Sequence, residues 1–78
     1  MIDDMVLKEV ISNVLGISIE EINDDSSPDN IEKWDSLSHI NLVMALESEF
    51  RVKLSPEDAM DMLSVKLIRM ILEDVLKD

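Results

Sequence analysis

The chain has 78 residues and a mass of 8.9 kDa, enough for one small domain and too little for a cofactor domain joined to a substrate domain. Seven basic residues against 18 acidic ones give a net charge of −11, so nucleic acid and anionic membrane surfaces would repel the chain. The sequence has no cysteine, which excludes disulfides, thiolate metal sites and a cysteine nucleophile. It has one histidine, which excludes a histidine-rich metal site and a mechanism with two histidines.

The apolar content predicts a folded chain despite this charge. Leu, Ile, Val and Phe supply 27 of the 78 residues, well above the roughly 20% below which a highly charged chain stays disordered. Residues 1–4 lack the basic region and apolar run of a signal peptide. No apolar stretch reaches the length of a membrane span. We therefore expect a single domain over residues 1–78 that works in the cytoplasm.

The first predicted element is a helix from Asp3 to Leu15. Its apolar residues recur at helical spacing, at Val6, Val10, Ile11 and Val14. Acids suit the start of this helix, and Gly16 suits its end because glycine adopts the left-handed conformation at least cost.

Residues 17–34 predict a long loop, in which Ile17, Ile19 and Ile22 contact the core. A calcium loop of the EF-hand type needs glycine at position 6 and a bidentate acid at position 12. Counting from Asp24 places Asp29 at position 6, and counting from one residue earlier places proline there, so neither register fits. The segment 23–30 is interpreted as a solvated polar loop, and no metal site is predicted.

A second helix is predicted from Ser36 to Phe50 or Arg51, with either Asp35 or Ser36 as its cap. Its apolar positions are Leu37, Ile40, Val43, Met44, Leu46 and Phe50. Met44 lies among them and is predicted to be a core residue.

Two further helices complete the expected fold. A short third helix begins after Ser55, where Pro56 occupies the first turn and Asp58 completes a capping pattern. A fourth helix begins after Ser64 and carries Val65, Ile68, Ile71, Leu72 and Val75. Met60 and Met62 flank the third helix. For these side chains, packing against the fourth helix is slightly favoured over exposure on a surface that binds a partner. The predicted fold is all-α: a four-helix bundle of three main helices and one short helix, with a long first loop.

The sequence gives little support for catalysis by the chain's own side chains. His39 follows Ser36 by three residues, but there is no Gly-x-Ser-x-Gly elbow and no recognisable oxyanion-hole loop. His39 is interpreted as a partly exposed helical side chain, and the protein is predicted not to be an enzyme. Ser36 has two interpretations that local physics leaves open: a helix cap, or a hydroxyl modified with an anionic group favoured by the helix N-terminus.

The segment Asp35-Ser36-Leu37, followed at fixed spacing by Ala45-Leu46-Glu47 and Phe50, resembles the second helix of acyl carrier proteins. The resemblance extends over the whole chain, through its length, acidity, long first loop and short third helix. It implies that Ser36 receives a covalent 4′-phosphopantetheine arm from coenzyme A, whose terminal thiol carries acyl groups as thioesters. It also implies that Asp35, Leu37 and four acids contribute to partner recognition, namely Glu47, Glu49, Glu57 and Asp58.

The resemblance further implies which proteins the chain meets. These are a phosphopantetheinyl transferase, which uses magnesium, and acyl-loading and acyl-processing enzymes with basic docking patches, in fatty-acid or specialised acyl biosynthesis. Acidic helices would steer the carrier, expected to be a monomer, to such patches. The alternative hypothesis is an acidic helical interaction module without a prosthetic group, in which Ser36 is only a cap.

Overall fold

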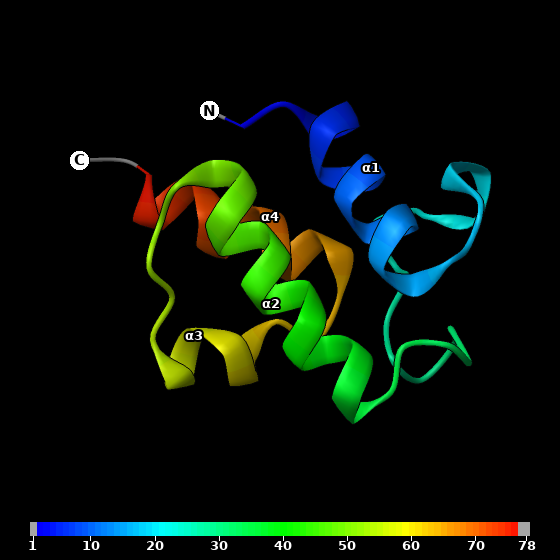
Figure 1. Ribbon diagram of the computed structural model, residues 1–78. Helices are drawn as coiled ribbons and strands as arrows, with labels where there is room; N and C mark the ends of the chain where they lie inside the picture. The colour runs from blue at the N-terminus through cyan, green and yellow to red at the C-terminus, as the bar shows by residue number, and fades with distance from the viewer. Residues whose placement is uncertain (1, 77–78) are drawn as a thin grey trace.

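The computed structural model describes residues 2–76 and confirms the all-helical prediction. It contains α1 (Asp4–Leu15), the 3₁₀ turn η1 (Ile19–Glu21), α2 (Ser36–Phe50), α3 (Pro56–Asp61) and α4 (Val65–Val75) (Figure 1). The bounds agree with the predicted helices within about a residue at each start. No strand occurs among the described residues, and none of the helices in residues 2–76 combines the length and hydropathy needed to cross a membrane.

Local signals fix where the helices begin and end. Asp3 accepts a hydrogen bond from the Met5 amide at 2.9 Å and caps α1, and Ser55 with Asp58 forms a reciprocal capping box at α3. Gly16 ends α1 with a left-handed φ of 68°. A Cβ there would meet only Lys33 Nζ at 3.9 Å, so the conformation rather than crowding requires glycine.

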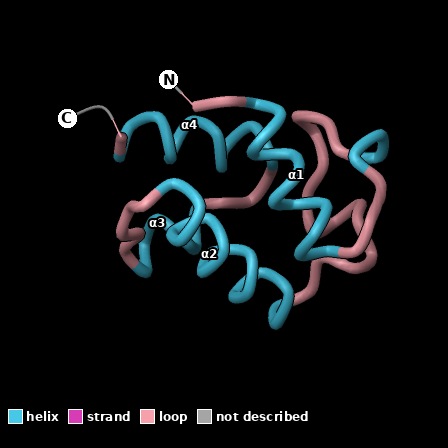
Figure 2. The backbone as a smooth tube through the Cα atoms, turned by 45° about the horizontal axis from the view of Figure 1, so that its top comes forward, coloured by secondary structure: helices cyan, strands magenta, loops and turns pink. Residues whose placement is uncertain are grey.

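One core joins the three long helices. α1 packs on α2 and α3 packs on α4. Twelve side chains are buried in this core: Leu7, Val10, Ile11, Leu15, Ile22, Trp34, Leu42, Leu46, Met62, Val65, Ile68 and Leu72. The loop after α1 runs along the side of the molecule where α1 lies, and α2 begins at the end remote from both termini (Figures 1 and 2).

The buried face of α2 differs from the predicted one. Leu46 is buried as expected, but Leu42, absent from the predicted stripe, is also fully buried. The prediction that Met44 is a core residue is wrong, because 61% of its surface is exposed. Apolar residues occur on several sides of α2, so helical spacing alone does not select the side that meets α1.

The two methionines predicted to flank the third helix differ in burial: Met60 lies in the last turn of α3, and Met62 is its C-cap. Met62 is fully buried, in line with the packing interpretation, whereas Met60 is 74% exposed and does not follow it. In the long loop, Ile22 is buried and Ile17 packs against the core, which confirms the anchoring role predicted for them. The loop also holds the unpredicted turn η1, whose signal was its capping box of Ser18 and Glu21.

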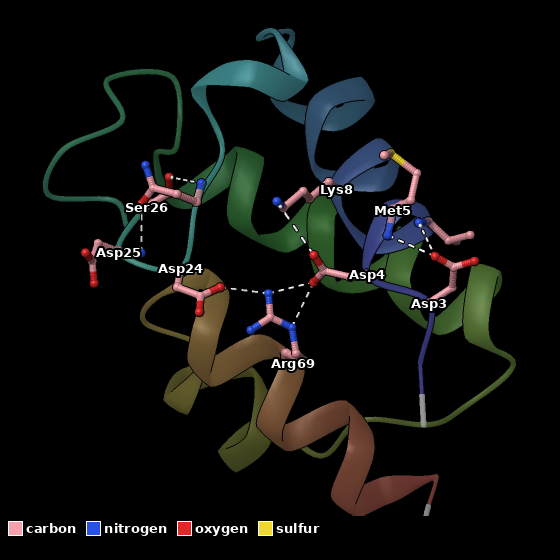
Figure 3. A network of polar contacts seen from close by, with 10 residues as sticks. Asp3, Asp4, Met5, Lys8, Asp24, Asp25, Ser26 and Arg69 are labelled. Atoms are coloured by element: carbon pink, nitrogen blue, oxygen red, sulfur yellow. Dashed lines mark hydrogen bonds and ion pairs between the residues drawn. The ribbon is translucent and has the colours of Figure 1, made fainter.

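The polar segment 23–30 is partly exposed to solvent and also bonded to α4. Arg69 of α4 donates to Asp4 of α1 at 2.9 Å and to Asp24 of the loop at 2.8 Å (Figure 3). The Val65 amide donates to the carbonyl of Ser26, a loop residue only 3% exposed. The expectation of a wholly solvated segment is therefore wrong at Ser26, because the N-terminal end of α4 pairs with the loop backbone.

Candidate functional site

Ser36 is the first residue of α2 and is exposed to solvent. Asp35 is the residue that caps this helix: its Oδ1 accepts a hydrogen bond from the Ser38 amide at 2.8 Å. Within residues 2–76 the Ser36 hydroxyl has no hydrogen-bond partner. The role of helix cap, which the sequence left open between Asp35 and Ser36, thus belongs to Asp35, and the Ser36 hydroxyl takes no part in capping.

The carboxylate of Asp35 is held in its charged form. The amide of Ser38 donates to it, and this hydrogen bond lowers the pKa of Asp35 below its ordinary value. A negative charge at this position also complements the partial positive charge at the start of α2. The residue beside Ser36 therefore presents a fixed anion to any protein that approaches the hydroxyl.

Trp34 anchors the loop immediately before the site. This residue is 2% exposed, and its Nε1–H donates to His39 Nδ1 at 3.0 Å. Because indole is a donor only, Nδ1 must be the acceptor, so His39 Nε2 carries the proton and donates to the Ala59 carbonyl at 2.8 Å. We call these two hydrogen bonds the Trp34–His39–Ala59 relay; they connect the loop, α2 and the last turn of α3. His39 is partly exposed, as predicted.

An apolar groove of about 560 Å³ opens beside Ser36. It lies between the start of α2 and the end of α3, and the relay described above forms part of its wall. Its lining comprises Pro28, Trp34, Asp35, Ser36, His39, Ile40, Met60, Met62 and Leu63. A flexible group attached at Ser36 would therefore have an apolar surface within immediate reach.

The remaining residues predicted for recognition lie at several places. Leu37 is 68% exposed and begins an exposed stripe that continues with Ile40 and Met44 along α2. Glu47 lies eleven residues from Ser36, about 16 Å along the helix. Its Oε2 accepts a hydrogen bond from the Leu54 amide at 2.8 Å, so it also fixes the segment after α2.

Of the other three predicted acids, two are exposed and one accepts a hydrogen bond at a helix cap. Glu49 near the end of α2 and Glu57 in α3 are exposed. Asp58 accepts a bond from the Ser55 amide at 3.3 Å as part of the α3 cap. Asp35, Ser36 and Leu37 are thus together at one end of α2, whereas the acids of α2 and α3 extend away from that end.

Residues 2–76 contain no group of three or more potential ligands arranged to hold a metal ion. Asp24, the acid from which a calcium loop was counted, is paired with Arg69 instead. The pKa of Asp24 is lowered, chiefly by its hydrogen bond with Arg69.

The chain is similar in sequence to curated acyl carrier proteins. The chain is 40% identical over 53 residues to the acyl carrier protein of Buchnera aphidicola subsp. Schizaphis graminum, covering 68% of this chain and 67% of that one. It is 38% identical over 60 residues to the acyl carrier protein of Nitratidesulfovibrio vulgaris, covering 77% and 79%.

The fold is shared with a solved structure. The holo acyl carrier protein of Geobacter metallireducens superposes with a TM-score of 0.86 at 23% identity, over 99% of this chain and 88% of that one. A family model described as a phosphopantetheine attachment site matches residues 6–71. Since that match covers well over half of the sequence, the chain belongs to the family of proteins that carry a phosphopantetheine attachment site.

Proposed function

We propose that Ser36 is the residue that carries the 4′-phosphopantetheine arm, and that the protein transports acyl groups as thioesters on the thiol of this arm. The observation that carries the proposal is the free, exposed hydroxyl of Ser36 next to a cap supplied by Asp35. The helix N-terminus favours the phosphodiester anion that attachment creates. The groove beside Ser36 offers apolar surface for the arm or its cargo.

Attachment would be a phosphoryl transfer from coenzyme A, with Mg²⁺, on a separate transferase. The Ser36 oxygen forms the new bond to phosphorus, the pyrophosphate bond of coenzyme A breaks, and adenosine 3′,5′-bisphosphate leaves. The serine proton passes to a base of the transferase. His39 is unsuited to that role, because its two ring nitrogens are engaged by Trp34 and by the Ala59 carbonyl. This supports a carrier that is modified by other enzymes and has no catalysis of its own.

The partners follow from the same features. The fixed charge of Asp35, the exposed Leu37 and the acids Glu49 and Glu57 suit a transferase and acyl-processing enzymes with basic, partly apolar docking patches. We expect one domain over residues 1–78 acting as a monomer, since chains of charge −11 repel each other. A working thiol also needs a reducing compartment, which favours the cytoplasm.

The alternative of an acidic interaction module without a prosthetic group is not favoured. The family model describes an attachment site, and the curated relatives named above are acyl carrier proteins. That alternative also needed Ser36 as the helix cap, a role that Asp35 fills.

A modification assay tests the proposal. The purified protein is incubated with coenzyme A, Mg²⁺ and a broad-specificity phosphopantetheinyl transferase, and its intact mass is measured. We expect the gain of one phosphopantetheine in the wild type and in Ser38→Ala, and none in Ser36→Ala. Because Asp35 is the cap, Ser36→Ala should change the free energy of unfolding by less than about 0.5 kcal/mol. A mass gain that persists in Ser36→Ala would place the attachment elsewhere.

A further inference from the structure

We propose that a second groove, between α3 and α4, is a docking surface for a cationic amphipathic helix of a partner protein. This groove has a volume of about 580 Å³. It is lined by Asp58, Asp61, Leu63, Leu67, Met70, Ile71 and Asp74. We call it the α3–α4 groove. Its binding of a partner does not depend on the modification proposed for Ser36.

The floor of the α3–α4 groove is apolar surface that the fold leaves in water. Leu63 is 60% exposed, Met70 54% and Leu67 37%. On α4 the core takes Val65, Ile68 and Leu72, and Ile71 packs half-buried against it, so Leu67 and Met70 are apolar surface additional to the buried face. Core packing therefore explains one side of α4 and leaves this second apolar side without a partner.

The charges around the groove select the kind of partner. All of its charged lining residues are carboxylates, and none of them forms an ion pair within residues 2–76. Arg69, a cation of α4, is directed instead toward Asp4 and Asp24 (Figure 3). Lysines or arginines flanking an apolar stripe on the partner would complement this arrangement. A second copy of this chain, with charge −11, is disfavoured.

The position of the groove between two helices suits a short helix as its occupant. It runs between two helices, and its α4 side from Leu67 to Asp74 extends about 10 Å, or roughly two helical turns. Leucine and methionine side chains adapt to the apolar face of such a helix. This is the recognition mode in which an amphipathic helix lays its apolar face into a groove.

The α3–α4 groove is separate from the attachment site but adjoins its groove. Ser36 and Leu37 do not line it, so a helix bound there leaves the Ser36 hydroxyl accessible. Leu63 lines both grooves. The arrangement suits a partner that holds the carrier while Ser36, or an arm on it, engages a different enzyme.

The test uses a synthetic helical peptide with leucines on one face and lysines on the other. It is titrated into the purified full chain, and amide shifts are followed by NMR. We expect shifts that centre on residues 63–74 and an affinity that falls as salt rises. The same peptide with glutamates in place of lysines should not bind.

Two matched variants decide which surface is used. Met70→Lys should weaken peptide binding about tenfold or more. Met44→Lys adds the same charge at a similarly exposed methionine of α2 and should change the affinity for the peptide less than about twofold. Ser36→Ala should bind as the wild type does, which keeps this result independent of the attachment site.

Three results would overturn the proposal. The first is binding that Met44→Lys abolishes and Met70→Lys leaves intact, because the peptide would then occupy α2. The second is the absence of any binding by the lysine peptide. The third is a concentration-dependent shift at Leu67 and Met70 without peptide, which would assign the groove to a second copy of the chain.

Discussion

At the scale of single residues, consecutive residues of the site have different structural roles. Asp35 caps α2, Trp34 anchors the preceding loop in the core, and Ser36, the first residue of the helix, is left exposed. His39 supports this arrangement from the next turn, because it accepts from Trp34 and donates to the Ala59 carbonyl. The Ser36 hydroxyl is thus exposed beside anchored neighbours and takes no part in their hydrogen bonds.

His39→Ala should destabilise the protein by about 1–3 kcal/mol, because the buried indole N–H of Trp34 and the Ala59 carbonyl both lose their partner. His39→Gln, which keeps a donor and an acceptor, should recover part of the loss. Urea unfolding can be followed by the emission of Trp34, the one tryptophan. Transfer of the arm to Ser36 should persist in His39→Ala. A variant as stable as the wild type would contradict the relay.

At the scale of elements, α4 is attached to distant parts of the chain through Arg69. Its guanidinium reaches Asp4 at the start of α1 and Asp24 in the long loop, and the backbone bonds from Val65 to Ser26 and from Lys66 to Asp24 add to the connection. The cluster fixes the middle of the loop, at Asp24 and Ser26, whereas Trp34 anchors the end that leads into Ser36. The long loop is therefore held by α4 as well as by its own apolar residues.

Arg69→Met should lower the melting temperature a few degrees more than Lys66→Met, which removes an equal charge from a residue without an ion pair in residues 2–76. The partner Asp24 has a lowered pKa, so its stabilising contribution is present above its ordinary value of 3.8 and is lost as pH falls through the lowered value. The gap between the two variants should therefore close in strong acid. Thermal melts at a series of pH values measure it, and a gap that did not change with pH would contradict this account.

At the scale of the whole molecule, charge repulsion opposes folding and association alike. Eighteen acids face seven bases, and only three ion pairs form within residues 2–76. Salt screens both the attraction within these ion pairs and the repulsion among carboxylates, but the unpaired carboxylates outnumber the ion pairs. The same excess of negative charge would attract the basic partners proposed above and make their docking sensitive to salt.

The melting temperature should rise as sodium chloride is added, and smaller additions of Mg²⁺ or Ca²⁺ should have the same effect. Differential scanning calorimetry of the unmodified protein measures this. The sign is the informative quantity: a melting temperature that stays constant or falls with ionic strength would mean that ion pairs such as the one between Arg69 and Asp24 outweigh the general repulsion.

Much of this protein was determined by short-range signals in its sequence. The caps at Asp3, Ser55 and Ser64, the left-handed Gly16 and the start of α2 at Ser36 all follow from interactions within a few residues, and these agree with the structure. The excess of acids is also a property of composition alone.

Only tertiary packing decided the rest. The burial of Leu42 instead of Met44, the engagement of Trp34 by His39, and the reach of Arg69 to acids 45 and 65 residues away depend on which surfaces meet in space. The α3–α4 groove has the same origin. Helical spacing describes one helix at a time, and when a helix is apolar on more than one side, its neighbours select which side is buried and which remains for partners.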